Sequence, residues 1–255
     1  MGTVAAVTDH PPSPPGSDPA RTAGGDGDGT GAEEHQEQAA WGEPAKSEPR
    51  WPSALAVGAA LVLYLILPRT VITGLGPRWL VPAVAGLLLL ILVIVSPRRI
   101  TPEAVRFRVL AIGLIAVINL ANIVTLIELV RALLSKHPGG RPLIFASVPV
   151  WLTNVLVFAL WHWERDRGGP VARLQAGHRQ PDFLFPQMSV PGATLPDWSP
   201  AFFDYLYTSF TNATAFSPTD TMPLTHWAKL LMMAQSLTSL LIVVLVISRA
   251  VNILS

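Results

Sequence analysis

Apolar segments recur along the chain from residue 53 onward and predict membrane-spanning helices. They cover residues 53–67, 79–95, 109–130, 142–163 and 230–247. A helix needs roughly 17 to 25 residues to cross about 30 Å of hydrocarbon, so the last four are long enough and the first is short. A soluble core helix would alternate apolar and charged faces, whereas residues 87–95 are apolar all round. The pattern predicts an all-α, polytopic transmembrane bundle of about five spans.

Tryptophans mark the predicted span ends independently of hydropathy. They are Trp51, Trp79, Trp161, Trp163 and Trp227. An indole ring is amphipathic and prefers the headgroup level, so these positions support the boundaries.

Residues 1–50 differ sharply from the rest of the chain. They are rich in Pro and Gly and carry nine acidic side chains against three basic ones. Such a segment cannot bury a core, so we predict a disordered acidic tail. It also lacks the basic start and apolar stretch of a secretory signal, which leaves targeting to the first span.

Composition narrows the class of protein further. Half of the residues are apolar, 14% are charged, and the mean hydropathy is +0.42. Beyond residue 50 the chain is net basic, with charges scattered over short loops. That distribution suits anionic lipid headgroups and excludes nucleic acid as a partner.

Cysteine is absent, and Arg outnumbers Lys 15 to 3 among abundant Ala, Gly and Pro. We expect a multi-pass protein of a bacterial plasma membrane, with the lipid bilayer as its partner.

The connection before the last span contains one more predicted helix. Residues 164–198 are basic and then Pro-rich, after which Ser199 and Pro200 provide an N-cap and a first helical position. We expect a helix of about 14 residues, ending at Ala213 or Thr214, which is too short to span. It would be interfacial or re-entrant. The predicted organisation is 1–50 tail, 51–163 four spans, 164–198 connection, and 199–255 short helix with last span.

Six positions of the short helix and the loop after it form a pattern ahead of the last span: Ser209, Phe210, Thr211, Thr214, Asp220 and Pro223. With this pattern the short helix, the loop and the last span resemble the pore helix, filter and inner helix of potassium-channel pore modules. The filter Thr-Val-Gly-Tyr-Gly would fall on residues 215–219, where both glycines are missing and Pro218 fixes φ. The resemblance implies a homo-oligomer and a small ion as partners, but potassium selectivity does not carry over.

The same stretch, with Asp182-Phe183 upstream, also resembles a family of uncharacterised bacterial multi-spanning membrane proteins of unknown function. Those proteins carry an Asp-Phe-Leu-Tyr-x-Ser-Phe-Thr segment before their last span, similar to Asp204–Thr211 here. This resemblance covers the last three predicted spans and names no activity.

The arginines predict the orientation. Ten basic residues fall on the face of the tail and the long connection and six on the opposite face. The positive-inside rule therefore favours a cytoplasmic tail and long connection.

Polar side chains inside the spans have two interpretations. Asn119 and Asn122 share a face and are more typical of interhelical hydrogen bonding than of a pathway. Glu128 has Arg131 at i+3, which predicts a local ion pair. Gln235 and Ser239 stack at i, i+4 and would either line a pore or pack against a neighbour.

We find no spacing of catalytic or metal-ligating residues, so we expect neither an enzyme nor a cofactor. His162, His178, His226, Asp182, Asp197, Asp204 and Asp220 are isolated in the sequence. Two hypotheses remain: a channel-like or transport-associated protein, and a non-transporting structural or interaction protein. The candidate pore or filter-like residues are Thr211, Thr214, Ser217, Thr219, Asp220, Gln235 and Ser239.

Overall fold

The computed structural model describes residues 48–68, 77, 79–95, 105–134, 140–174, 180–189, 198–215 and 220–254. Helices dominate this part of the chain, as predicted. They are α2 (Trp51–Ile66), α3 (Leu80–Val95), α4 (Val105–Leu134), α5 (Gly140–Arg165), the single turn α6 (Pro186–Ser189), α7 (Phe202–Ala215) and α8 (His226–Leu254). Two short 3₁₀ segments, Asp166–Gly168 and Ala172–Leu174, follow α5.

Within the part of the chain that the structure describes, three helices are long and apolar enough to cross a membrane. The qualifying stretches are Arg108–Ala132 in α4, Phe145–Gly168 from α5 onward, and His226–Ser248 in α8. Helices α2 and α3 have 16 residues each, which gives about 24 Å of rise against a hydrocarbon thickness of about 30 Å. Within the described residues, three helices therefore have the length and apolar composition of a membrane span. Helices α2 and α3 are shorter, although the segment 79–95 was expected to be long enough.

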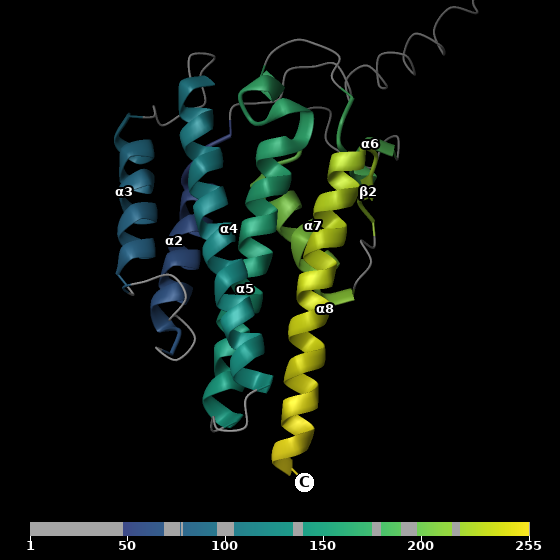
Figure 1. Cartoon of the computed structure of the whole chain (residues 1–255). Helices are drawn as coiled ribbons and strands as arrows, with labels where there is room; N and C mark the ends of the chain where they lie inside the picture. The colour runs from purple at the N-terminus through teal and green to yellow at the C-terminus, as the bar shows by residue number, and fades with distance from the viewer. Residues whose placement is uncertain are drawn as a thin grey trace, which may run out of the picture.

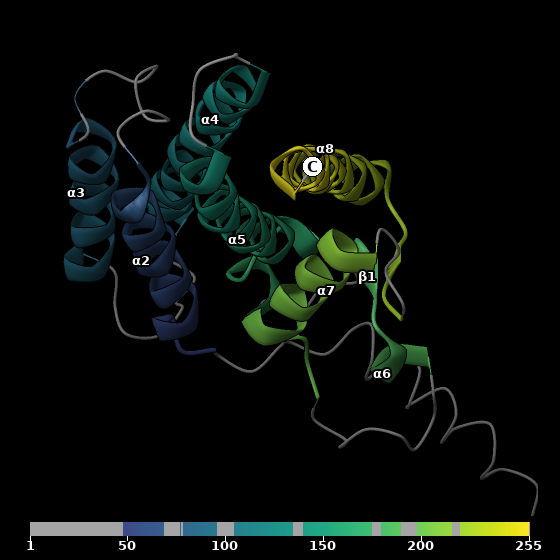
Figure 2. The same cartoon turned by 90° about the horizontal axis from the view of Figure 1, so that it is seen from below.

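Helix α5 occupies the middle of the bundle (Figures 1 and 2). It packs against α2 and α4 on one side and against α7 and α8 on the other, while α3 packs on α4 and α2. A hydrophobic core joins α5 and α7 through Trp163, Phe202 and Tyr205. A second one lies further along the bundle, where Val150 of α5 and Ile242 of α8 meet.

The long connection is tied back to the segment before α8 by a two-stranded antiparallel pair. β1 (Phe183–Leu184) lies against β2 (Met222–Pro223), with Phe183 opposite Pro223 and Leu184 opposite Met222. Pro223 therefore serves in a strand pair as well as separating α7 from α8.

The predicted short helix is present with the expected length, but it begins later. Helix α7 has 14 residues and starts at Phe202, so Pro200 is not its first residue and Ser199 is not its N-cap. The carboxylate of Asp204 instead accepts a hydrogen bond from the backbone N–H of Ala201 at 2.7 Å. An acidic residue in the third helical position can bond the N–H of the capping residue in this way, which moves the start to Ala201.

Of the predicted tail, residues 1–50, residues 1–47 lie outside the described residues. Glu48, near its end, makes contacts with α5 and α7.

Candidate functional site

Five of the seven candidate pore or filter-like residues belong to α7 or to the stretch between α7 and β2. Thr211 donates its hydroxyl to the carbonyls of Tyr207 and Thr208, and Thr214 bonds back to its own helix in the same way. Ser217 and Thr219 lie outside the described residues. Asp220 is exposed and precedes β2.

Gln235 lies at the centre of a buried polar contact between α7 and α8. Its Nε2 donates to the carbonyl oxygen of Ser209 at 2.8 Å and to the Ser209 Oγ at 2.6 Å. Its Oε1 accepts from Nδ2 of Asn212 at 2.9 Å. Both polar ends of the Gln235 amide are thus bonded, and the side chain has no exposed surface.

The contact extends along α8 beyond Gln235 and reaches α5. Ser236 donates to Oδ1 of Asn212 at 3.1 Å. Ser239, also fully buried, accepts from Nδ2 of Asn154 on α5 at 3.1 Å. Ser209 donates its hydroxyl to the carbonyl of Val155 on α5 at 2.7 Å.

These side chains form one continuous set, here named the α5–α7–α8 polar interface: Asn154, Ser209, Asn212, Gln235, Ser236 and Ser239. The predicted shared face of Gln235 and Ser239 is confirmed, and within the single chain it is directed at α7 and α5. Every member is a neutral amide or hydroxyl, so the interface can position helices through hydrogen bonds but carries no carboxylate or imidazole that could act as an acid or a base.

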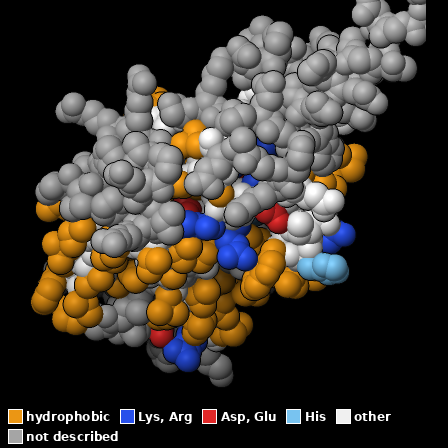
Figure 3. All heavy atoms as spheres, turned by 90° about the horizontal axis from the view of Figure 1, so that it is seen from above, with side chains coloured by type: hydrophobic (Ala, Val, Ile, Leu, Met, Phe, Trp, Pro, Cys, Tyr) orange, Lys and Arg blue, Asp and Glu red, His pale blue; other side chains and the backbone are white. Residues whose placement is uncertain are grey.

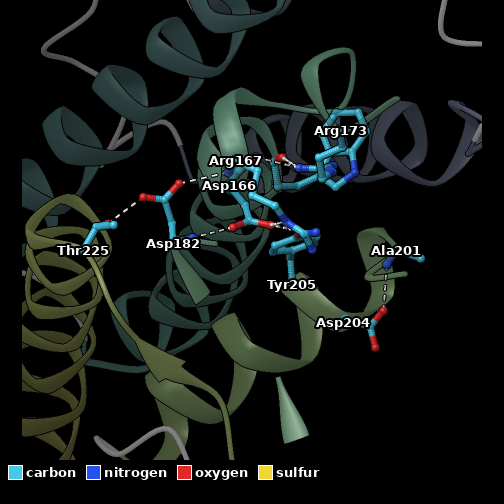
Figure 4. Close-up of polar contacts among 9 residues, drawn as sticks. Asp166, Arg167, Arg173, Asp182, Ala201, Asp204, Tyr205 and Thr225 are labelled. Atoms are coloured by element: carbon cyan, nitrogen blue, oxygen red, sulfur yellow. Dashed lines mark hydrogen bonds and ion pairs between the residues drawn. The ribbon is translucent and has the colours of Figure 1, made fainter. Parts of the chain in front are cut away.

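A second polar cluster lies where α5 ends, with the Asp166 carboxylate at its centre (Figure 4). Asp166 is fully buried. Its Oδ2 accepts from the Tyr205 hydroxyl at 2.6 Å and from Arg167 Nε at 3.3 Å, and its Oδ1 accepts from the backbone N–H of Asp182 at 2.8 Å. One carboxylate therefore joins α5, α7 and the start of β1. We call this group the Asp166 cluster: Asp166, Arg167, Arg173, Asp182, Tyr205 and Thr225.

Asp182 carries the cluster to the last helix. Its Oδ2 accepts from the backbone N–H of Arg167 at 3.0 Å, and its Oδ1 accepts from the Thr225 hydroxyl at 2.6 Å. The Thr225 oxygen accepts in turn from the N–H of Ala228 at 3.3 Å, which makes Thr225 the N-cap of α8. Asp182 therefore fixes the point at which α8 begins.

Arg173 closes the carboxyl end of α5. Its Nη1 donates to the carbonyls of Trp163 at 2.8 Å and Asp166 at 3.1 Å, groups that a helix end leaves without intrahelical partners. Its guanidinium also lies 5.4 Å from the ring centre of Tyr205. Burial raises the pKa of Tyr205 well above its usual value, with the Arg173 charge acting in the opposite direction. Tyr205 is therefore a phenol that donates to Asp166.

The turn after α5 requires an unusual backbone. Arg167, Gly168 and Gly169 all have positive φ, at 51°, 81° and 94°. Glycine adopts this region cheaply, while Arg167 is held there by its N–H bond to Asp182. At Gly169 a Cβ would lie 2.8 Å from the carbonyl oxygen of Glu164. The Gly-Gly pair is therefore what lets the chain fold back onto α5.

Two further ion contacts surround this end of the bundle. Arg108 on α4 donates its Nε to the buried Glu164 carboxylate at 3.1 Å. Glu48 accepts from Trp163 Nε1 at 2.9 Å and from the backbone N–H of Phe202 at 2.6 Å. Because Phe202 is the first residue of α7, Glu48 places a negative charge at a helix N-terminus, where the helix dipole favours it.

The sequence missed the centre of this cluster. Asp182 is among the candidates that the sequence offers, but Asp166, Arg173 and Tyr205 are not. The partners Asp182 and Tyr205 lie 16 and 39 positions from Asp166 in the chain, so no local spacing brings them together. The usable signal was the Asp166-Arg167-Gly168-Gly169 run after an apolar helix, since acidic and glycine residues there indicate a structured turn.

His162, another isolated candidate, is buried against Phe183 with ring centres 4.9 Å apart. Among the described residues neither of its ring nitrogens has a hydrogen-bond partner. His226 is exposed, whereas His178 and Asp197 lie outside the described residues.

The predicted ion pair of Glu128 and Arg131 is present at 2.8 Å on an exposed surface. Asn122 is buried, and Asn119 beside it is partly exposed.

Within the part of the chain that the structure describes, no three acidic or histidine side chains converge as metal ligands would. Comparison of the chain with protein families, with curated proteins and with solved structures gives no match. The candidate site is therefore described from contacts within the chain alone. It consists of the neutral α5–α7–α8 polar interface and, next to it, the Asp166 cluster, which fixes the end of α5 and the start of α8.

Proposed function

We propose that this chain is a non-transporting structural or interaction protein of the membrane, in which α5, α7 and α8 form a closed three-helix unit. The observation that carries the proposal is the hydrogen bonding of Gln235. Its amide is fully covered and bonded at both ends to α7. A residue that lined a water-filled path through this unit would keep part of its polar surface free for water or ions.

The membrane setting follows from surface chemistry. Helix α8 exposes Leu237, Val244, Ile247 and Val251, each more than half accessible. A water-soluble monomer rarely leaves so continuous an apolar face uncovered, whereas lipid covers it without cost. In this proposal α2 and α3 accompany the three long helices in the bilayer, and α7 is a re-entrant helix.

The orientation of the unit rests on its arginines. The contacts of Arg108 and Arg173 bring the start of α4 and the end of α5 to the same end of the bundle. The sequence analysis assigns Arg108 and Arg173 to the same side of the membrane, and these contacts support that assignment. We place this end in the cytoplasm, following the positive-inside rule.

Ion flux tests the proposal directly. Purified protein reconstituted in liposomes should give no flux of K⁺, Na⁺, H⁺ or Cl⁻ above that of empty vesicles. Flux that depends on Gln235, measured with Gln235→Leu beside the exposed control Arg131→Gln, would overturn it.

A channel-like assembly remains the second candidate, and one arrangement favours it. Helix α7 packs against both α5 and α8, as a pore helix does between the two long helices of a pore module. In such an assembly the conducting path would lie between copies, next to exposed surfaces. Cross-linking in the native membrane distinguishes the two, because a channel of this kind requires a closed oligomer around α8.

A further inference from the structure

We propose that an anionic phospholipid binds at the start of α8, with its headgroup at Arg165, His226 and Lys229 and its acyl chains along the outward face of the helix. This goes beyond the proposed function, since it assigns a specific ligand to one end of the bundle.

The first observation is which basic side chains near the start of α8 lie beside a carboxylate. Arg108 and Arg167 each lie beside a carboxylate, at 3.1 and 3.3 Å. Arg173 is buried and bonded to carbonyls. Within the described residues, Arg165 and Lys229 have no carboxylate within salt-bridge distance. Two cations thus have their charge available to a ligand.

The second observation is that Arg165 lies beside an exposed tryptophan at the start of α8. The Arg165 guanidinium lies 5.0 Å from the ring centre of Trp227, and Trp227 is 61% exposed. An exposed indole at a span end prefers the headgroup level. The cation–π contact holds the Arg165 charge at that level while leaving its N–H groups able to bond a phosphate.

The third observation is the continuity between these charges and an apolar face. Trp227, Leu230, Met233, Leu237 and Leu241 are all at least 42% exposed. They follow one another down α8 from the same end as His226 and Lys229, which are also exposed. In the space-filling view from this end of the bundle, a histidine side chain lies beside a basic one at one edge, near hydrophobic side chains (Figure 3).

A phospholipid fits both parts of this surface at once. Its phosphate is the anion that the unpaired cations favour, and its chains cover the exposed leucines. A free phosphate would use only the charges, and a second copy of the chain would place the same cations against one another. Anionic lipid attracts basic residues near the membrane surface by an amount equivalent to roughly fivefold in affinity for each charge.

The test uses the full chain in phosphatidylcholine bilayers that contain spin-labelled phosphatidylglycerol or spin-labelled phosphatidylcholine. The preference of the protein for phosphatidylglycerol, read from the motionally restricted lipid, should fall roughly fivefold for Lys229→Gln and further for Arg165→Gln/Lys229→Gln. The control is Arg131→Gln, which removes an exposed cation at the other end of α4 and should leave the preference unchanged.

Three results would overturn the proposal. The first is an equal preference in wild type and Lys229→Gln, a single exposed substitution that does not disturb the core. The second is an equal loss in Arg131→Gln, which would indicate charge attraction without a site. The third is displacement of the labelled lipid by soluble glycerol phosphate, which would show that the charges bind phosphate alone.

Discussion

The carboxylate of Asp166 accepts a hydrogen bond from the backbone of Asp182, and the carboxylate of Asp182 accepts one from the backbone of Arg167. The N–H of Asp182 donates to Asp166 Oδ1 at 2.8 Å, and the N–H of Arg167, next to Asp166, donates to Asp182 Oδ2 at 3.0 Å. Two like-charged side chains thus lie in one cluster without facing each other, because each carboxylate accepts hydrogen bonds from a peptide group. The pair connects the end of α5 to the strand that precedes α7 and, through Thr225, to the start of α8.

Replacing Asp182 by Ala should destabilise the fold. The substitution leaves the N–H of Arg167 and the hydroxyl of Thr225 without their acceptor, and hydrogen bonds to charged groups contribute about 1.5–3 kcal/mol each. Thermal unfolding of the purified protein, followed by circular dichroism, measures the effect. Asp220→Ala is the control, since Asp220 is exposed, and an equal loss in both variants would contradict the role given to Asp182.

Gln235→Leu should lower stability although it adds apolar surface inside an apolar bundle. The leucine cannot bond Ser209 or Asn212, and a buried polar group without a partner costs about 1–3 kcal/mol. Thr238→Val is the matched control on the same helix, because the Thr238 hydroxyl bonds only to the carbonyl of Ala234 in its own helix. If unfolding in detergent shows the same midpoint for Gln235→Leu as for wild type, the α5–α7–α8 polar interface does not hold α8 in place.

Gly169→Ala should prevent the turn after α5 from closing. The new Cβ would lie 2.8 Å from the Glu164 carbonyl, at a φ of 94° that side chains rarely adopt. Gly113→Ala is the control, because nothing lies within 4 Å of its added Cβ. In a helix that change should stabilise by roughly 0.5–1 kcal/mol. The yield of folded protein after extraction from the membrane is compared for the two variants. A normal yield for Gly169→Ala would contradict the close approach of the Gly169 position to the Glu164 carbonyl oxygen.

Removing the Glu48 carboxylate should loosen α7 from α5. Glu48→Ala deletes the acceptor for Trp163 Nε1 and for the first N–H of α7. The loss of a helix cap costs about 0.5–2 kcal/mol. Glu128→Ala should cost far less, about 0.3–0.5 kcal/mol, because its ion pair with Arg131 is exposed. Hydrogen exchange of the α7 amides provides the measurement, and unchanged protection in Glu48→Ala would refute the contact.

Part of this fold could be predicted because it depends on neighbours in sequence. Apolar runs gave the places of α4, α5 and α8, and helical spacing put Gln235 beside Ser239 and Glu128 beside Arg131. The length of α7 followed from its helix-forming run and the prolines after it. Its start did not, because the N–H groups at its beginning are satisfied by Asp204 and Glu48, and the latter is 154 positions away.

The sequence by itself determined which segments are helical and which are apolar, since both follow from local composition and period. Only the tertiary structure decided where the polar face of α8 points and which charges are neutralised. Gln235 could face a pore or a neighbour with the same helical spacing, and the packing of α7 against α8 directs it to Ser209 and Asn212. The sequence around Asp166 indicates only a turn after an apolar helix. Asp166 becomes central because burial gives its few hydrogen bonds a strength that water would have weakened.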